Sequence, residues 1–267
     1  MSSYRKYRYY LLSIWKLLVG MKPVTGIMRA FLRPSVAVQQ TIEIRNTGQR
    51  FRTRGVMDIW SVKETFLDRF YERFSTSIGD GWTVCDIGGG IGDFTIFVAS
   101  LNPQNVVYSF EPTPDSFKVL QENLKLNQIE NAQAFPQAIW SEDGQIVIDT
   151  TVGEPGQFTS KEIGANKQVD SGKVIVPSIT LAQAFEATGI ALCNLLKIDC
   201  EGAEYEILFN TPAEILNRVE RIIMEYHDNV SQYTHTDLET FLRNNGFAVK
   251  IYPNDVHNYL GYLYASR

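Results

Sequence analysis

The sequence predicts an α/β protein with an open, mostly parallel sheet, an antiparallel strand at its C-terminal edge and a helical N-terminal extension. From residue 82 onward, short apolar runs alternate with stretches of helical periodicity, which is typical of parallel βαβ units. Four glycines within residues 88–92 separate the first apolar run from a helical pattern. The chain of 267 residues is 44% hydrophobic and 21% charged, an ordinary balance for a globular protein.

The expected elements follow one another in a regular order. Thr113 and Pro114 suit an N-cap and the first residue of a helix, and Ser61–Glu64 and Thr236–Glu239 have the spacing of capping boxes. Phe66, Phe70 and Phe74 recur at helical spacing and are expected in the core. Strands are expected at 82–87, 105–110, 132–139, 145–149, 173–177, 193–199, 219–226, 247–252 and 259–265, and helices at 92–101, 114–127, 180–187, up to 209 and up to 246.

Composition divides the chain near residue 58. We expect residues 1–58 to form a basic extension, helical at first and with a β-ribbon at 41–57, and residues 59–267 to form the main domain. Within that domain, the polar and glycine-rich stretch 150–172 is expected to be an insertion loop. A loop of this length in a compact domain is more often functional than idle.

Charge is spread unevenly along the chain. Residues 1–54 hold eleven Lys and Arg and one acid, Glu43, while the remainder holds 14 basic and 29 acidic residues. Residues 1–34 therefore suit either a helix packed on the main domain or on a second subunit of a homo-oligomer, or a helix lying on an anionic membrane surface. The acidic body argues against a nucleic-acid partner.

Cysteine usage and hydropathy bear on the compartment. The three cysteines show no metal-ligand spacing, which suggests reduced thiols, and no apolar run approaches the roughly 18 residues that a membrane-spanning helix needs. We expect a cytoplasmic protein, with the inner face of the membrane as an alternative position. No metal site is expected, although Asp199, Glu225 and His227 together could bind a divalent ion.

Polar residues follow successive strands of the predicted sheet. In an open parallel sheet, ligands bind beyond the carboxyl ends of the strands, where the strand order reverses. An acid 23 residues after Gly88 and directly after the second strand, Glu111, can accept both hydroxyls of an adenosine ribose. The residues expected at this rim are Asp86, Gly88, Gly90, Gly92, Glu111, Ile139, Ser141, Asp199, Glu201, Glu225 and His227.

The spacing within the glycine turn bears on which adenosine cofactor binds. Dinucleotide sites favour G-x-G-x-x-G, whereas here Gly88, Gly90 and Gly92 alternate, and Asp86 and Asp93 flank them. This negative charge suits a cationic ligand, and S-adenosylmethionine carries a sulfonium and an ammonium. An NAD-dependent oxidoreductase and a non-catalytic, membrane-associated binding protein of the same fold remain the alternatives.

Three segments resemble the FkbM-type S-adenosylmethionine-dependent methyltransferases: Asp86–Phe94, Ser109–Pro112 and Leu196–Leu208. The resemblance covers residues 60–265 and departs from the usual family pattern at Gly89, where alanine is common. It implies the Rossmann-like class I fold with a seven-stranded sheet. It also implies O-methylation of a hydroxyl on a small molecule, glycan or lipid-linked acceptor, such as a sugar, a glycolipid or a polyketide.

The resemblance also implies roles for individual residues. Asp86, Gly88 and Gly90 would hold the methionine end of the cofactor, together with Gly92, Asp93 and Phe94 of the same motif. Glu111 would hold the ribose, Ser141 and Glu142 would lie near the adenine, and Pro112 and Ile139 would enclose its ring.

Transfer to a hydroxyl requires a group that accepts the hydroxyl proton. Asp199, Glu201, Glu225 and His227 are the candidates, and Asp199 is expected either to accept the proton or to orient the acceptor. His227 ends a strand at the rim, and histidine titrates near neutral pH. Glu201 has an alternative place at the start of the following helix, where an acid is favoured by the helix dipole.

Overall fold

The computed structural model describes residues 3–32, 39–149, 157–158, 172–254, 257 and 259–267. The expected insertion loop 150–172 therefore lies outside the described residues except for 157–158 and 172. No helix in the described ranges is long and apolar enough to cross a membrane.

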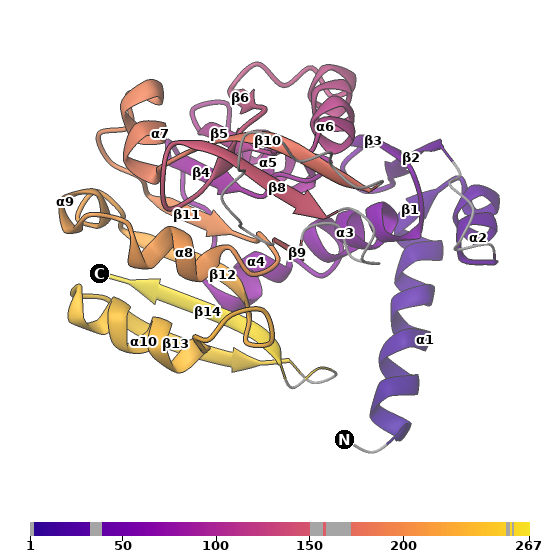
Figure 1. The fold of residues 1–267 in the computed structure, drawn as a ribbon. Coiled ribbons are helices and arrows are strands. Elements are labelled where there is room, and N and C mark those ends of the chain that lie inside the picture. The colour runs from indigo at the N-terminus through magenta and orange to yellow at the C-terminus, as the bar shows by residue number, and fades with distance from the viewer. Residues whose placement is uncertain (1–2, 33–38, 150–156, 159–171, 255–256, 258) are drawn as a thin grey trace.

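The central sheet has the predicted architecture. In the described part of the chain, seven strands run in the order β13-β14-β12-β11-β4-β5-β6, and β14 alone is antiparallel to its neighbours. The strand order reverses between β4 and β11 (Figure 1). At such a point ligands bind beyond the carboxyl ends of the strands. The strands are β4 (Thr83–Ile87), β5 (Val106–Phe110), β6 (Ala132–Phe135), β11 (Leu195–Ile198), β12 (Arg221–His227), β13 (Ala248–Pro253) and β14 (Leu260–Ser266).

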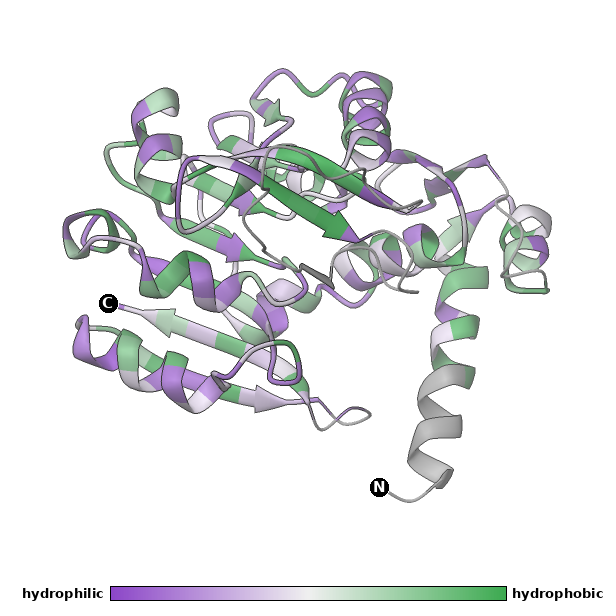
Figure 2. Cartoon of the chain, viewed as in Figure 1, coloured by the Kyte–Doolittle hydropathy of each residue, from purple (hydrophilic) through white to green (hydrophobic). Residues whose placement is uncertain are grey.

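Helices cover both faces of this sheet, because successive residues of a buried strand point to opposite faces. In β4, Val84 packs with Phe94 of α5, whereas Cys85 belongs to the cluster that contains Phe185 of α7 and Leu208 of α8. The strands are accordingly hydrophobic along most of their length (Figure 2). One face carries α3 (Val56–Phe66), α4 (Phe70–Phe74) and α5 (Asp93–Leu101), with α6 (Pro114–Leu126) beside α5; the other carries α7 (Leu181–Thr188), α8 (Glu204–Phe209), α9 (Ala213–Leu216) and α10 (His235–Asn244).

The single strand expected at 132–139 is wrong. The chain forms β6 and then, after Pro136, the short β7 (Ala138–Ile139), which pairs with β10 in a second sheet. Proline has no N–H to donate and ends the first ladder. The second sheet has the order β7-β10-β8-β9, with β8 (Gly144–Asp149), β9 (Gln157–Phe158) and β10 (Lys173–Ile179).

The N-terminal extension is joined closely to the sheet domain. It comprises α1 (Ser3–Gly20), β1 (Met21–Lys22), α2 (Val24–Leu32), β2 (Gln40–Ile44) and β3 (Arg50–Thr53), and the three strands form an antiparallel sheet. The backbone N–H groups of Arg50 and Arg52 donate to Asn127 (2.8 Å) and Asn123 (2.7 Å) at the end of α6. The division of the chain into two parts at residue 58 stays a prediction. Residue 58 itself lies inside α3, which begins at Val56.

Both predicted capping boxes are misplaced. Ser61 lies inside α3 and not at its start. The helix begins at Val56, and Ile59 in its first turn is buried in the core. Helix α10 is capped by Thr234, whose N–H donates to Asp237 at 2.8 Å, two residues earlier than expected.

The phenylalanine stripe spans two helices, α3 and α4. Phe66 packs edge-on against Phe97 of the core, at 5.4 Å between ring centroids. Phe70 and Phe74 of α4 line a cavity instead.

Candidate active site

A cavity of about 1150 Å³ lies at the carboxyl ends of β4, β5, β11 and β12, where the sheet topology places a ligand. The expected residues that line it are Gly88, Gly90, Asp93, Glu111, Pro112, Ile139, Asp199, Glu201, Glu225 and His227. Asp86, Gly92, Phe94 and Ser141 are not among its lining residues. Asp86 and Phe94 are buried beneath the turn, and Ser141 is half-buried.

The glycine turn touches the loop that follows β11. Gly88 has φ 78°, and a Cβ at this position would stand 1.9 Å from the carbonyl oxygen of Asp199. Only glycine allows this approach. At Gly90 a Cβ would meet no atom within 4 Å, so the turn presents bare backbone to open space in the cavity.

Glu111 holds the turn as well as lining the cavity. Its side-chain oxygens accept hydrogen bonds from the N–H groups of Gly90 (2.8 Å) and Thr113 (2.9 Å). Burial raises the pKa of Glu111, and the bonds from Thr113 and Gly90 oppose that rise. The Thr113 hydroxyl also donates to Oε1. Each carboxylate oxygen can accept two bonds, so Oε1 is fully used and Oε2 can accept one more bond, from a ligand hydroxyl.

A buried lysine, which sequence reasoning missed, organises the floor of the cavity. Lys197 Nζ lies 3.0 Å from Asp86 Oδ1, donates to the Gly88 carbonyl at 2.7 Å and lies 3.9 Å from Asp199 Oδ2. Burial lowers the lysine pKa, but the charges of Asp86 and Asp199 outweigh it and hold the pKa above its ordinary value. In the sequence, a charged residue in the middle of an apolar strand was the signal that could have revealed the buried ion pair of Lys197 and Asp86.

Asp86 therefore supports the turn from below. It is fully buried, and besides Lys197 it accepts a 2.6 Å hydrogen bond from Thr95. The direct contact with the methionine end that the resemblance implies stays a prediction.

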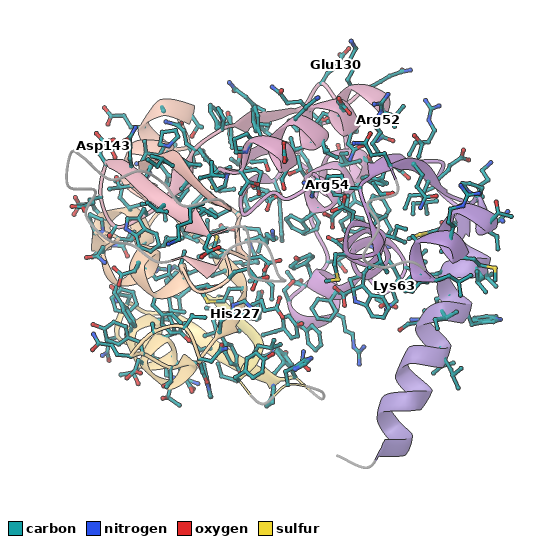
Figure 3. The ribbon with its side chains drawn as sticks, turned by 45° about the vertical axis from the view of Figure 1, so that its right-hand side comes forward. Arg52, Arg54, Lys63, Glu130, Asp143 and His227 are labelled. Atoms are coloured by element: carbon teal, nitrogen blue, oxygen red, sulfur yellow. The ribbon has the colours of Figure 1, made fainter. Side chains whose placement is uncertain are left out.

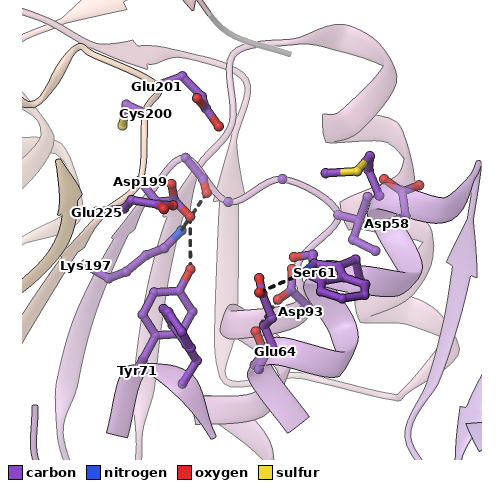
Figure 4. A pocket seen from close by; sticks show the side chains of 18 of the residues that line it. Asp58, Ser61, Glu64, Tyr71, Asp93, Lys197, Asp199, Cys200, Glu201 and Glu225 are labelled. Carbon is purple, nitrogen blue, oxygen red and sulfur yellow. Dashed lines mark hydrogen bonds and ion pairs between the residues drawn. The ribbon is translucent and has the colours of Figure 1, made fainter. Parts of the chain in front are cut away.

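Asp199 is held by a residue far away in the sequence. The hydroxyl of Tyr71, in α4, donates to Asp199 Oδ2 at 3.0 Å, and its ring packs edge-on against Phe94. Burial and the charge of Asp199 raise the pKa of Tyr71 well above its ordinary value, so the phenol keeps its proton and remains a donor. Figure 4 shows Tyr71, Lys197 and Asp199 converging on one wall of the cavity.

Folding raises the pKa of two of the predicted proton acceptors. Burial, followed by the charge of Asp199, raises the pKa of Glu225 well above its ordinary value, and its Oε1 accepts a 2.9 Å bond from Tyr262. Burial would lower the pKa of His227, but Glu204, and beyond it Glu201 and Glu225, raise it to about 10. His227 therefore carries a proton at neutral pH and is not favoured as the group that removes one.

Two carboxylates hold His227 in place. One of them, Glu204, occupies the helix start that the sequence suggests as an alternative place for Glu201. His227 Nδ1 lies 3.0 Å from Glu204 Oε1, and Nε2 lies 3.3 Å from Glu201 Oε2. Helix α8 begins at Glu204, and Glu201 precedes it with φ 53°. Figure 3 shows His227 beside the C-terminal elements, with Arg54 and Lys63 on the N-terminal side of the molecule.

The opposite wall of the cavity comes from α3 and the segments before it. Glu64 Oε1 accepts a 2.8 Å bond from Trp60 Nε1, and Arg54 pairs with Asp58 at 2.9 Å. Asp93 accepts a hydrogen bond from Thr65, and burial raises the pKa of Asp93. Sequence reasoning predicted Asp93 but missed the rest of this wall, because the other residues precede the recognisable motifs. Leu12, Ile14, Phe31 and Met57 extend it as an apolar margin formed by α1, α2 and α3.

No three His, Cys, Asp or Glu side chains in the described ranges gather as metal ligands.

Comparisons with known proteins agree with this geometry. The profile of the Methyltransferase FkbM domain matches residues 86–249. Methyltransferase 1 of Beauveria bassiana is 27% identical over 204 residues, covering 71% of this chain and 80% of that protein. The 31-O-demethyl-FK506 methyltransferase FkbM of Streptomyces tacrolimicus is 26% identical, covering 70% and 80%.

Two further relatives extend the comparison. Hexuronic acid methyltransferase AglP of Haloferax volcanii is 25% identical over 226 residues, covering 80% of this chain and 82% of that protein. The crystal structure of Methyltransferase FkbM from Methylobacillus flagellatus has a TM-score of 0.51 at 10% identity, covering 96% of this chain and 58% of that one. This structural likeness concerns the fold.

Proposed function

The chain belongs to the FkbM methyltransferase family and is an S-adenosylmethionine-dependent methyltransferase, and from this premise we propose that it methylates a hydroxyl group of a sugar, a glycolipid or another small natural product. The observation that carries the proposal is the shared cavity at the switch point of the sheet. The glycine turn and Glu111 line one part of it, and the carboxylates of Asp199 and Glu64 line two facing walls.

The residues of the turn fit the methyl donor. Gly90 offers bare backbone beside open space, Glu111 Oε2 can accept a bond from a ribose hydroxyl, and Asp93 and Asp199 lie where negative charge would stabilise a cationic methionine end. When bound, S-adenosylmethionine supplies an activated methyl group on a sulfonium. A crystal structure with S-adenosylhomocysteine would contradict this placement if the ribose lay away from Glu111.

The work left to the protein is alignment and proton removal. Holding reacting groups in line is worth about 7–11 kcal/mol of the barrier. Tyr71 and Lys197 fix the Asp199 carboxylate, which thereby becomes a rigid acceptor that can orient a hydroxyl. Such preorganisation by supporting contacts is what a positioning group requires.

The names of two relatives support the class of acceptor. One is named for 31-O-demethyl-FK506 and the other for a hexuronic acid. In this cavity, carboxylates and the aromatic rings of Trp60, Phe70 and Tyr262 lie together. Carboxylates accept hydrogen bonds from hydroxyls, and flat rings offer apolar contact to a sugar or macrocycle.

We expect methyl transfer only to acceptors with a free hydroxyl. The experiment offers labelled S-adenosylmethionine with a panel of hydroxylated glycans, glycolipids and polyketides, each paired with a control whose hydroxyls are already methylated. The label should enter the free acceptors as a methyl ether that resists mild alkali. Label that alkali releases would reveal a methyl ester, and so a carboxyl acceptor, and would contradict the proposal.

We further propose that α1 and α2 contact an anionic membrane. Figure 1 shows α1 extending away from the sheet domain, and Leu11, Trp15 and Val19 on it are 69%, 62% and 54% exposed. Helices α1 and α2 together carry five basic residues and no acid, so they combine apolar and cationic groups, which is the composition of interfacial helices.

The membrane contact can be measured by sedimentation with vesicles. The protein should sediment with vesicles that contain anionic lipid and remain in solution with neutral ones, because the basic residues need an anionic surface. Replacing both Leu11 and Trp15 with serine should abolish sedimentation without changing thermal unfolding. The membrane contact would be contradicted if the protein bound neither kind of vesicle, or if the variant still sedimented. Dimers that form with rising protein concentration would assign the surface of α1 and α2 to a second copy of the chain.

A further inference from the structure

Glu64 reaches the cavity from the wall that faces Asp199. Figure 4 shows its carboxylate across the cavity from the group formed by Tyr71, Lys197 and Asp199. Trp60, one helical turn earlier in α3, donates to Glu64 Oε1 at 2.8 Å. This bond orients the carboxylate and leaves its second oxygen, Oε2, to a ligand.

The other carboxylates at the rim are committed to protein partners. Asp199 accepts from Tyr71 and faces the Lys197 ammonium, and Glu201 faces the imidazolium of His227. Glu225 is the acceptor for the Tyr262 hydroxyl.

The three remaining acids of the lining hold elements of the fold together. Asp58 pairs with Arg54 at 2.9 Å. Asp93, at the start of α5, accepts from Thr65 of α3. Glu111 ties the glycine turn to the loop after β5 through Gly90 and Thr113. Glu64 and Glu225 each line the cavity and accept one hydrogen bond, but Glu225 lies beside Asp199 and Lys197, whereas Glu64 lies across the cavity from them.

We propose that Glu64 is the catalytic residue that accepts the proton of the acceptor hydroxyl, an inference that rests on the proposed O-methylation. In the transfer, a bond forms between the acceptor oxygen and the methyl carbon while the carbon–sulfur bond breaks. The electron pair of that bond stays on sulfur and leaves neutral S-adenosylhomocysteine. The hydroxyl proton passes to Glu64 Oε2 and afterwards to solvent.

The surroundings of Glu64 suit this task. Burial raises the pKa of Glu64 to about 7, opposed by Lys63 and the Trp60 hydrogen bond and reinforced by the charges of Asp68 and Asp199. The charge of Glu64 also acts on Tyr262 in β14, whose pKa is raised by burial and by the charges of Glu225 and Glu64. A general base is most effective when its pKa lies near the working pH.

The experiment is Glu64→Gln in the full chain. Glutamine keeps a carbonyl oxygen for Trp60, so the fold is expected to persist, but it cannot accept a proton. With a hydroxylated acceptor, kcat should fall by about 10²–10⁴-fold. The wild-type rate should rise with pH through about 7 and level off, because only the deprotonated carboxylate acts, and the variant should lose this limb.

A cofactor-binding role for Glu64 is separated by affinity. S-adenosylhomocysteine keeps the ammonium of the methyl donor, so a carboxylate that paired with it would show weaker calorimetric binding in Glu64→Gln. We expect unchanged binding. Glu122→Gln, on the outer side of α6 and paired with Arg52, serves as the matched control and should keep full turnover.

Three outcomes decide the inference. Full turnover of Glu64→Gln on a hydroxylated acceptor would overturn the role of Glu64 and leave O-methylation standing. A parallel loss of S-adenosylhomocysteine affinity would assign Glu64 to the cofactor instead. Wild-type methylation confined to acceptors without a hydroxyl would overturn the proposed function, and the role of Glu64 with it.

Discussion

Lys197→Met is expected to lower the free energy of unfolding by about 3–5 kcal/mol, because it leaves a buried carboxylate without its cation. Asp86 is fully buried and Lys197 is 3% exposed, so water cannot replace the lost partner. The Gly88 carbonyl loses its 2.7 Å donor in the same variant. Urea unfolding followed by circular dichroism measures the change.

Two further variants test whether the buried pair is the cause. Lys250→Met, at an exposed position in β13, should change stability by no more than about 0.5 kcal/mol. The double variant Lys197→Met/Asp86→Asn should recover part of the loss, since no uncompensated charge remains. Wild-type stability of Lys197→Met would show that Asp86 needs no cation.

Gly88→Ala is expected to weaken S-adenosylhomocysteine binding by at least about 100-fold, the equivalent of roughly 3 kcal/mol. The added Cβ would stand 1.9 Å from the Asp199 carbonyl oxygen, on backbone that has no rotamer to change. The φ of 78° adds a penalty of about 1–2 kcal/mol for a residue with a side chain. The turn must therefore move away from the loop after β11, and the cofactor cradle moves with it.

Gly189→Ala is the matched control for backbone strain. Gly189 ends α7 with φ 68°, and a Cβ there would meet nothing within 4 Å. This variant should lose about 1 kcal/mol of stability and bind S-adenosylhomocysteine normally when measured by calorimetry. Equal affinity in both variants would mean that the contact between Gly88 and Asp199 does not shape the cofactor site.

The rim of the sheet could be predicted because strand ends are a local property of the sequence. Parallel strands carry their carboxyl ends to one edge, so Gly88, Glu111 and Asp199 had to converge once the strands were recognised. Where the side chain of a residue just inside a strand end lies is not a local property of the sequence. Asp86 supports the turn from beneath and does not line the cavity, because its side chain meets Lys197 of the neighbouring strand.

The helices before the first core strand lay beyond such reasoning. Tyr71 and Glu64 share the cavity with Asp199, although they are separated from it by 128 residues or more along the chain. In the sequence, Tyr71 and Glu64 belong to segments with the periodicity of an ordinary amphipathic helix. The spacing of Phe70 and Phe74 even predicts that they lie in the core. These side chains line the cavity only because α3 and α4 pack over the carboxyl ends of the strands.

The sequence by itself determined the α/β sheet, the glycine turn, the place of Glu111 at the rim and the methyltransferase family, because strand pattern, glycine spacing and motif residues are written along the chain. The tertiary structure alone decided which acids carry a proton. The pKa of an ionisable side chain depends on its burial and on charges brought near by folding, and so His227 holds a proton at neutral pH while Glu64 titrates near neutral pH.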